Sequence, residues 1–399
     1  MSFLPTAFID SLEGVTGFDR QSFVEVHASG QPPVSIRINP LKFPPNIFTD
    51  LPLAGKVPWC KNGFYLDHRP SFTLDPSFHA GSYYVQEASS MFLEQVLQQT
   101  CNLNASCKIL DLCAAPGGKS THIQSLVTEN TLLVSNEVIR QRVNVLEENC
   151  VKWGGANMIV TSNDARDFTR LENYFDIIIV DAPCSGSGLF RKDPSAVNEW
   201  SVQQVEMCAG RQQRILTDVL PSLNENGVLI YATCSYSPKE NEEICDWLVD
   251  HFSLTSISLQ CDPTWNIVET NSVKSGVAGY RFFPHLVRGE GFFIACFRKE
   301  SKVIAKEMKK ASKNILTPLT RKQTVLLQPF LENSEAVECF TWDDRILAFP
   351  TGFSDHLSNL KGLHLRIAGI CVGRVAHDEL LPDHGLALSG IIRKNFVGI

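Results

Sequence analysis

The chain has 399 residues, of which 44% are hydrophobic and 20% charged, and its net charge is −7. These proportions are typical of a globular protein long enough for two or three domains, so they exclude a disordered or fibrous chain. No run approaches about eighteen apolar residues, and no basic region precedes an apolar core at the N-terminus. We therefore expect no membrane span and no secretory signal, which predicts an intracellular, cytoplasmic protein.

The 13 cysteines are scattered singly along the chain. No CxxC pair occurs, so the spacing does not predict a zinc or iron–sulfur site. An odd number of thiols in a reducing compartment also argues against a disulfide framework. We expect no metal, and most of the cysteines should be small buried hydrophobic residues.

The first part of the chain, residues 1–98, is predicted to form a short helical cap and a small α+β subdomain. The cap ends at the Pro-rich break "SGQPPVS", after which short apolar runs alternate with Gly, Pro and Asn. Within this part, "SIRINP" contains Arg37 and Asn39. These two residues either contact RNA or belong to a simple turn.

Residues 99–300 alternate between apolar, strand-like runs and helical patterns, which predicts an α/β domain with a mostly parallel sheet. The runs interpreted as buried strands are "KILDLC", "TLLVSNEV", "NMIVTSN", "FDIIIVDAP" and "GVLIYATCS". The segments "GKSTHIQSLV" and "RQRVNVLEENCVKW" are interpreted as helices, and "GEGFFIACFRK" as a returning edge strand. Ligands of such folds bind at the carboxyl ends of the strands.

A glycine-rich turn, "DLCAAPGGKS", joins the first of these strands to its helix. A phosphate-binding P-loop would need a glycine where Cys113 stands, and the dinucleotide fingerprint G-x-G-x-x-G is absent. What remains is a turn of small residues, Ala114, Ala115, Gly117 and Gly118. Such a turn can admit a nucleoside that carries no diphosphate.

Three carboxylates follow the next strands at their carboxyl ends, namely Glu137, Asp164 and Asp181. Glu137 can bind both hydroxyls of a ribose, and Asp164 could accept a hydrogen bond from an adenine amino group. Any single acid of this kind can also be a cap of a turn or helix. Because suitable groups recur at four strand ends, S-adenosylmethionine, a nucleoside without phosphates, is the ligand that fits best.

Two thiols follow two of the core strands, Cys184 in "VDAPCSGSG" and Cys234 in "YATCSYS". Methylation of cytosine at carbon 5 needs a thiolate that adds to carbon 6, because the ring is otherwise too electron-poor to attack a methyl donor. Cysteine suits this task because its thiolate is strongly nucleophilic. A second thiol nearby can help to end the cycle, but the residues alone do not say which cysteine attacks.

A lysine-rich connector occupies residues 301–315 and either contacts RNA phosphates or is a solvated linker. The remaining segment, 316–399, consists of short apolar runs and turns. We predict that it forms an accessory, β-rich domain.

In these motifs the chain resembles the Sun-type RNA (cytosine-5) methyltransferases over about residues 30–300. The segments that carry the resemblance are "SIRINP", "GSYYVQEASSM", "DLCAAPGGKS", "SNEVIRQRV", "SNDARDF", "DAPCSGSGLFRKDP", "TCSYSPKENEE" and "RFFPHLVRGEGFFIACFRK". The resemblance implies a Rossmann-like class I methyltransferase fold with a mostly parallel, seven-stranded sheet. It also implies S-adenosylmethionine as cofactor and RNA as partner.

The resemblance assigns roles to individual residues. Cys234 would be the nucleophile, Cys184 would assist product release, and Asp181 would hydrogen-bond the base. The residues that would hold the cofactor are Cys113, Ala114, Ala115, Pro116, Gly117, Gly118, Lys119, Glu137, Asp164 and Asp181. Arg191 and Lys192 in "GLFRKDP" could contact nucleotides that flank a flipped-out cytosine, whereas the neighbouring Phe190 could equally belong to the core.

The C-terminal segment resembles the PUA-like domain of bacterial members that modify small-subunit (16S) ribosomal RNA, and "GRQQRIL" is close to the same subgroup. We therefore predict a monomeric rRNA methyltransferase, with transfer RNA as the alternative substrate. A catalytically silent ribosome-assembly factor is a further alternative, although such a protein would have no need of both thiols. An amino-methylating enzyme is disfavoured, because "DAPC" stands where such enzymes carry Asn/Asp-Pro-Pro-Tyr/Phe.

Overall fold

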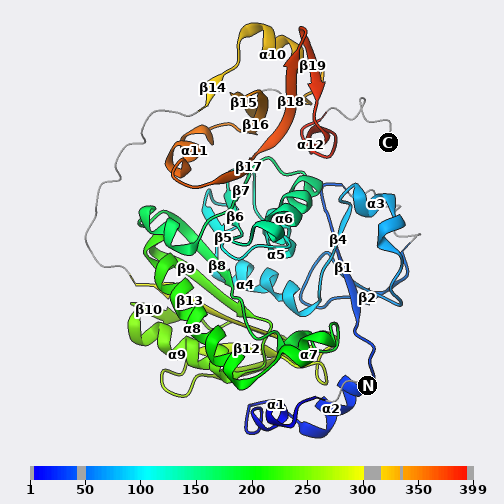
Figure 1. The fold of residues 1–399 in the computed structure, drawn as a ribbon, viewed down its shortest axis with the longest axis vertical. Helices are drawn as coiled ribbons and strands as arrows, with labels where there is room; N and C mark the ends of the chain where they lie inside the picture. The colour runs from blue at the N-terminus through cyan, green and yellow to red at the C-terminus, as the bar shows by residue number, and fades with distance from the viewer. Residues whose placement is uncertain (1–3, 43–50, 301–315, 333–335, 393–399) are drawn as a thin grey trace.

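The computed structural model describes residues 4–42, 51–300, 316–332 and 336–392. They form a large central sheet, a small N-terminal sheet and a small C-terminal sheet (Figure 1). The lysine-rich connector at 301–315, for which RNA contacts were considered, lies outside the described residues. Across the described ranges, no helix has both the length and the apolar character needed to cross a membrane.

Five parallel strands form the middle of the central sheet, in the order β7-β6-β5-β8-β9. Their bounds are β5 Lys108–Asp111, β6 Leu132–Asn136, β7 Met158–Thr161, β8 Phe175–Asp181 and β9 Leu223–Thr233. All five were predicted from their apolar runs. Such runs are expected here because a parallel sheet is covered on both faces.

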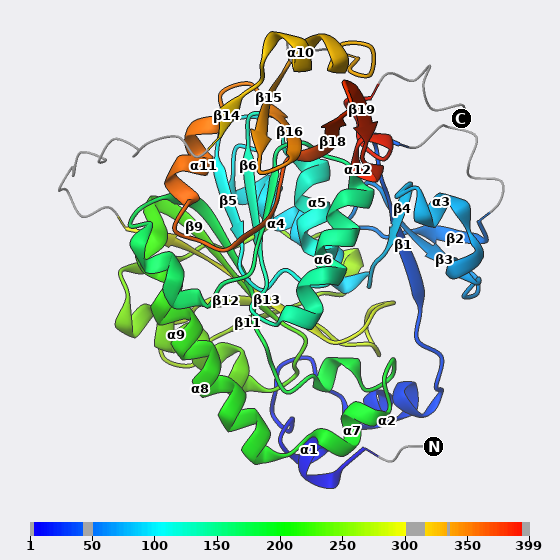
Figure 2. The same cartoon turned by 45° about the horizontal axis from the view of Figure 1, so that its top comes forward.

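Helices cover both faces of this sheet (Figures 1 and 2). One face carries α4 (Leu93–Thr100), α5 (Gly118–Leu126) and α6 (Arg140–Trp153), and the other carries α8 (Val202–Val219) and α9 (Glu242–His251). Since successive side chains of a strand point to opposite faces, Ile109 joins the first core and Leu110 joins the second. The carboxyl ends of the strands are thereby left free for a site.

The prediction that "GEGFFIACFRK" forms an edge strand is wrong. This strand, β13 (Phe292–Lys299), runs antiparallel to β9 and is flanked on its other side by β12 (Ala278–Phe282). The sheet then continues to β11 (Val268–Asn271), and β10 (Leu254–Ser256) also pairs with β13. Together with one strand from the C-terminal part, the sheet has ten strands rather than the seven expected.

The N-terminal part contains α1 (Thr6–Asp10) and α2 (Arg20–Ala28), followed by a four-stranded antiparallel sheet. That sheet has the order β2-β3-β1-β4, with β1 Val34–Ile38, β2 Leu53–Lys56, β3 Gly63–Leu66 and β4 Tyr83–Val85, and α3 (Pro76–His79) precedes β4. The two helices pack elsewhere, against Phe190, Tyr236 and Phe283. Phe190 is therefore a core residue, and its ring centroid lies 5.0 Å from that of Phe8.

The C-terminal part has a five-stranded sheet of order β14-β15-β16-β18-β19. Its elements are β14 Thr317–Pro318, α10 Arg321–Leu327, β15 Val337–Trp342, β16 Arg345–Pro350, α11 Ser354–Leu360, β17 Leu365–Ala368, β18 Ile370–Ala376, β19 Glu379–Pro382 and α12 His384–Ala387. The strand β17 leaves this sheet and pairs with β7, so it extends the central sheet. An ion pair between Arg366 and Glu147 supports the junction.

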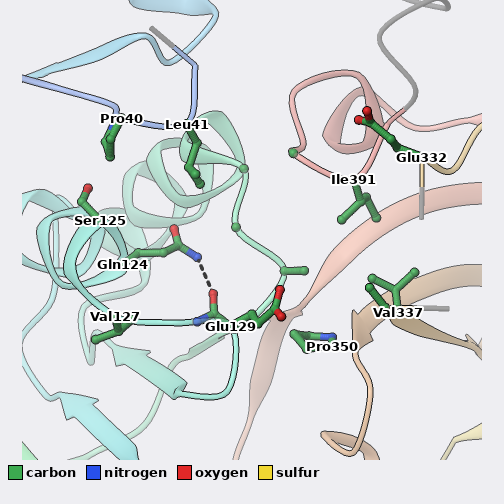
Figure 3. A pocket seen from close by; sticks show the side chains of 16 residues that line it. Pro40, Leu41, Gln124, Ser125, Val127, Glu129, Glu332, Val337, Pro350 and Ile391 are labelled. Carbon is green, nitrogen blue, oxygen red and sulfur yellow. Dashed lines mark hydrogen bonds between the residues drawn. The ribbon is translucent and has the colours of Figure 1, made fainter. Parts of the chain in front are cut away.

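A cavity of about 470 Å³ lies between the C-terminal part and the loops around α5 (Figure 3). Gln124 and Ser125 come from α5, Leu41 follows β1, and Val337 and Ile391 face them from the C-terminal part. None of the residues predicted for catalysis or for cofactor binding lines this cavity.

Candidate active site

The two thiols predicted to act together lie side by side. Strands β8 and β9 are parallel neighbours with Asp181 opposite Ala232, so the loops that follow them emerge at the same edge of the sheet. Cys184 and Cys234 stand in these loops, and their sulfur atoms are 3.1 Å apart. Both are free cysteines, and both line one cavity.

A close hydrogen bond couples the two thiols. The hydrogen bond with Cys234 raises the pKa of the Cys184 thiol well above its usual range, and burial and the negative charge of the Cys234 thiolate act in the same direction. The Cys184 thiol therefore lies within hydrogen-bonding reach of the Cys234 sulfur and can donate a proton to it.

A buried carboxylate, Glu240, joins the two cysteine loops. It accepts hydrogen bonds from the Ser185 amide at 2.7 Å, the Ser185 hydroxyl at 2.6 Å and the Ser235 hydroxyl at 2.5 Å. Ser185 follows Cys184, and Ser235 follows Cys234. Burial raises the pKa of Glu240, although these hydrogen bonds counteract the shift. Sequence reasoning missed Glu240 as a site residue, and its only signal was its place in "TCSYSPKENEE".

Asp181, at the end of β8, is held by a lysine from the glycine-rich turn. The Lys119 ammonium lies 2.6 Å from Asp181 Oδ2. Burial lowers the pKa of Lys119, but attraction to Asp181 and Asp111 outweighs burial and raises it overall. Lys119 is therefore a permanent cation beside Asp181.

The cavity that contains both thiols has a volume of about 440 Å³ and opens at the carboxyl ends of the parallel strands. The predicted site residues that line it are Cys113, Ala115, Glu137, Asp164, Asp181, Cys184 and Cys234. Ala114, Pro116, Gly117, Gly118 and Lys119 do not line it. They form the turn beneath, where Gly117 has a φ of 108° that favours glycine and Gly118 begins α5.

Two carboxylates of the cavity are suited to a nucleoside. Glu137 is buried, and its Oε1 accepts a hydrogen bond from the Ile139 amide at 2.9 Å. Its Oε2 has no hydrogen-bond partner among the described residues and lies 3.3 Å from the Arg142 guanidinium. Asp164 accepts from the Arg166 amide and caps a 3-10 helix, Ala165–Arg170, so it is a cap as well as a cavity residue. A buried carboxylate of a cavity residue, with one oxygen that accepts no hydrogen bond among the described residues, fits the hydroxyl donors of a ribose.

Two of the expected RNA contacts do not fit the structure. Arg37 is buried and donates to Gln86, Ser125 and Thr121. Asn39 is buried as well and donates to two backbone carbonyl groups. The donors of Arg37 and Asn39 are hydrogen-bonded to acceptors inside the protein, including groups of α5 and α6. The "SIRINP" segment therefore holds the N-terminal sheet against these two helices.

The remaining RNA candidates differ in exposure. The Arg191 side chain is buried, donates to the Gln31 carbonyl and lies 3.8 Å from Glu290, whereas Lys192 is exposed. Two cations that sequence reasoning missed, Arg211 and Arg214 of α8, are exposed and line the thiol cavity. Neither forms an ion pair with another described residue.

Comparisons with known proteins show which family the chain is similar to. Residues 98–298 match the family described as 16S rRNA methyltransferase RsmB/F, and residues 4–88 match the N-terminal domain of 16S rRNA methyltransferase RsmF. Ribosomal RNA small subunit methyltransferase F of Pectobacterium atrosepticum is 31% identical over 382 residues, or 90% of this chain and 77% of that protein. The protein of the same name from Aeromonas salmonicida is 32% identical over an alignment of 416 residues, which covers 98% of this chain and 86% of that protein.

Solved structures support the fold. A methyltransferase homolog from Pyrococcus horikoshii superposes with a TM-score of 0.59 and 27% identity, covering 74% of this chain and 100% of that one. NSun6 from the same organism, solved with the S-adenosylmethionine analogue SFG, superposes with a TM-score of 0.62 and covers 75% of this chain and 100% of that one. Because the two sequences are 20% identical, this likeness bears on the fold alone. The expected α/β methyltransferase fold and the expected family are confirmed. This chain belongs to the 16S rRNA methyltransferase RsmB/F family.

Proposed function

We propose that this chain transfers a methyl group from S-adenosylmethionine to carbon 5 of a cytosine in small-subunit ribosomal RNA, through a covalent adduct with Cys234. The observation that carries the proposal is the pair of sulfur atoms 3.1 Å apart at the wall of a cavity at the sheet's carboxyl edge. One flipped-out base can reach both sulfur atoms from such a cavity.

The first step assigned to the protein is nucleophilic addition. The Cys234 thiolate forms a bond with carbon 6, and the electrons of the 5,6 double bond move to carbon 5, which becomes nucleophilic. Asp181 would hydrogen-bond the base and favour protonation at its ring nitrogen, which offsets the developing charge. Lys119, at 2.6 Å, holds the Asp181 carboxylate in place.

The last step is the release of the product. Once carbon 5 carries the methyl group, it must lose its proton to a base, and the carbon–sulfur bond must break so that the double bond re-forms. Cys184 is placed to exchange a proton with the departing Cys234 sulfur. The hydrogen bond with Cys234 and burial raise the pKa of Cys184, so a protonated thiol is present to hydrogen-bond to the departing sulfur.

When bound, S-adenosylmethionine supplies an activated methyl group on a sulfonium sulfur. The chain would hold it with Glu137 at the ribose hydroxyls and Asp164 at the adenine amino group. The small side chains of Cys113 and Ala115 leave room for the nucleoside. Arg211 and Arg214 at the same cavity are proposed to contact phosphates of the RNA, since both cations are exposed.

We further propose that the chain divides into four parts. These are an N-terminal helical cap with a small α+β subdomain (1–98), a methyltransferase domain (99–300), a lysine-rich linker (301–315) and a PUA-like RNA-binding domain (316–399). We also place the chain in the cytoplasm as a monomer that acts on ribosomal rather than transfer RNA. Support for the substrate comes from relatives named small subunit methyltransferases.

Two cysteine variants test the proposal. With Cys234→Ala we expect no methylation of unmodified small-subunit RNA, whereas calorimetry should still show cofactor binding. With Cys184→Ala we expect a covalent protein–RNA complex that a denaturing gel reveals as a slowed band. Cys150→Ala, which removes a buried thiol from α6, should behave like the unaltered protein. Retained turnover in Cys234→Ala refutes the assignment.

The substrate is tested separately, by bisulfite sequencing of total RNA from cells with and without the gene. A cytosine in small-subunit RNA that resists bisulfite conversion in cells with the gene, and is converted in cells without it, supports the proposed target. Loss of a protected cytosine only in transfer RNA would overturn it. No change in any RNA would favour a silent assembly factor.

A further inference from the structure

A second cluster of reactive side chains lies outside the active site. Cys60, Glu94 and His122 come from the turn between β2 and β3, from α4 and from α5. Their exposed fractions are 3%, 3% and 1%. Cys60 and Glu94 are 34 positions apart along the chain, and Glu94 and His122 are 28 apart. No local sequence motif therefore predicts the cluster.

The three donor atoms form a nearly regular triangle. Cys60 Sγ lies 3.2 Å from Glu94 Oε2 and 3.7 Å from His122 Nε2, and the last two atoms are 3.2 Å apart. A tetrahedral zinc ion has bonds of about 2.3 Å to sulfur and about 2.0–2.1 Å to nitrogen and oxygen, which places its ligand atoms about 3.3–3.6 Å from one another. The observed triangle is therefore one face of such a tetrahedron, to within a few tenths of an ångström.

The surroundings orient the donors toward this shared point. The Lys61 amide at 3.1 Å and the Gln98 side chain at 3.2 Å both donate to Glu94 Oε1, which leaves Oε2 for the cluster. His122 Nδ1 is buried and has no hydrogen-bond partner among the described residues, so the ring's hydrogen bonds run through Nε2, within the cluster. The three residues are also the only His, Cys, Asp or Glu set within the described ranges that could share a metal ion.

We propose that Cys60, Glu94 and His122 form a zinc-binding site. One thiolate, one imidazole and one carboxylate are a ligand combination that suits Zn²⁺. On binding, Cys60 exchanges its proton for the metal, and the proton leaves to the solvent. The ion joins the N-terminal part to α4 and to α5, the helix that begins at the cofactor turn. The site thus stabilises the region beneath the active site without taking part in methyl transfer.

The experiment measures zinc in the full chain purified without chelator. The Cys184→Ala, Cys234→Ala double variant serves as background, because two thiols 3.1 Å apart could bind a metal by themselves. We expect an equimolar amount of zinc by elemental mass spectrometry, lost when Cys60→Ser or His122→Gln is added. Cys150→Ser, which alters an equally buried thiol, should retain it.

A spectroscopic readout protects the test against variants that fail to fold. Cobalt(II) alone, added to the metal-free background protein, should produce a thiolate-to-cobalt charge-transfer band in the near ultraviolet. Zinc should then abolish the band. Absence of the band, or equal zinc content with and without Cys60→Ser, overturns the proposal and leaves a hydrogen-bonded triad.

Discussion

Glu240 is the residue whose replacement tests the architecture of the active site most directly. Its Oε2 accepts from the hydroxyls of Ser185 and Ser235, and its Oε1 accepts from the Ser185 amide. In Glu240→Gln an amide NH₂ takes the place of one oxygen. If it replaces Oε2, both hydroxyls must turn away from it or accept instead of donate. The two cysteine loops then lose their common anchor.

The size of the effect follows from the bonds that change. A hydrogen bond to a charged group contributes about 1.5–3 kcal/mol, against about 1 kcal/mol for a neutral one. Converting two charge-assisted bonds into neutral or broken ones therefore costs about 2–4 kcal/mol. If about half of this cost, about 1–2 kcal/mol, appears in the transition state, the rate of methyl transfer decreases about 5- to 30-fold, at 1.36 kcal/mol per factor of ten.

The assay is single-turnover methylation of unmodified RNA, with urea unfolding and cofactor binding measured in parallel. Glu240→Gln should lower the rate and the unfolding free energy while the dissociation constant of S-adenosylmethionine stays unchanged, since Glu240 does not line the cavity. Glu243→Gln is the matched control, because Glu243 is exposed in the same sequence run. A Glu240→Gln enzyme as fast and as stable as the control would refute the anchoring role.

Further predictions concern the surrounding cations and one buried acid. Lys119→Met should slow methyl transfer at saturating RNA while cofactor binding persists, because Asp181 loses its partner at 2.6 Å; an unchanged single-turnover rate would contradict this. Arg211→Gln and Arg214→Gln should each weaken RNA binding and reduce the slope of log affinity against log salt by about 1, and an unaltered slope would exclude phosphate contact. Burial raises the pKa of Glu290 from its ordinary value of 4.5 to about 7. The folded state therefore holds this proton more tightly than the unfolded state, so stability falls as pH rises from about 4.5 through about 7, by at most about 3 kcal/mol. Urea unfolding of Glu290→Gln should show a gain relative to the unaltered chain that grows between about pH 5 and pH 8; a pH-independent difference would disprove this account.

The sequence by itself determined the five parallel strands at the middle of the central sheet and the edge at which its chemistry lies. Apolar runs predict β5, β6, β7, β8 and β9, because strands covered on both faces must be apolar throughout. Small residues at a strand end likewise predict a nucleoside site. The two cysteines could be placed together from the same logic, since parallel neighbouring strands end at one edge.

Only the tertiary structure decided which polar residues serve the site and which serve the core. Arg37 has the cationic side chain expected of an RNA contact, but its hydrogen-bond partners lie 49 to 88 positions away in the sequence and bury it. Glu240 reaches the Cys184 loop through a contact with Ser185, 55 positions away, and β17 joins the central sheet by pairing Leu365 with Thr161 of β7. A sequence pattern reports the period of local structure, whereas the burial of a charge depends on segments that only folding brings together. For the same reason the Cys60, Glu94 and His122 cluster became visible only in three dimensions.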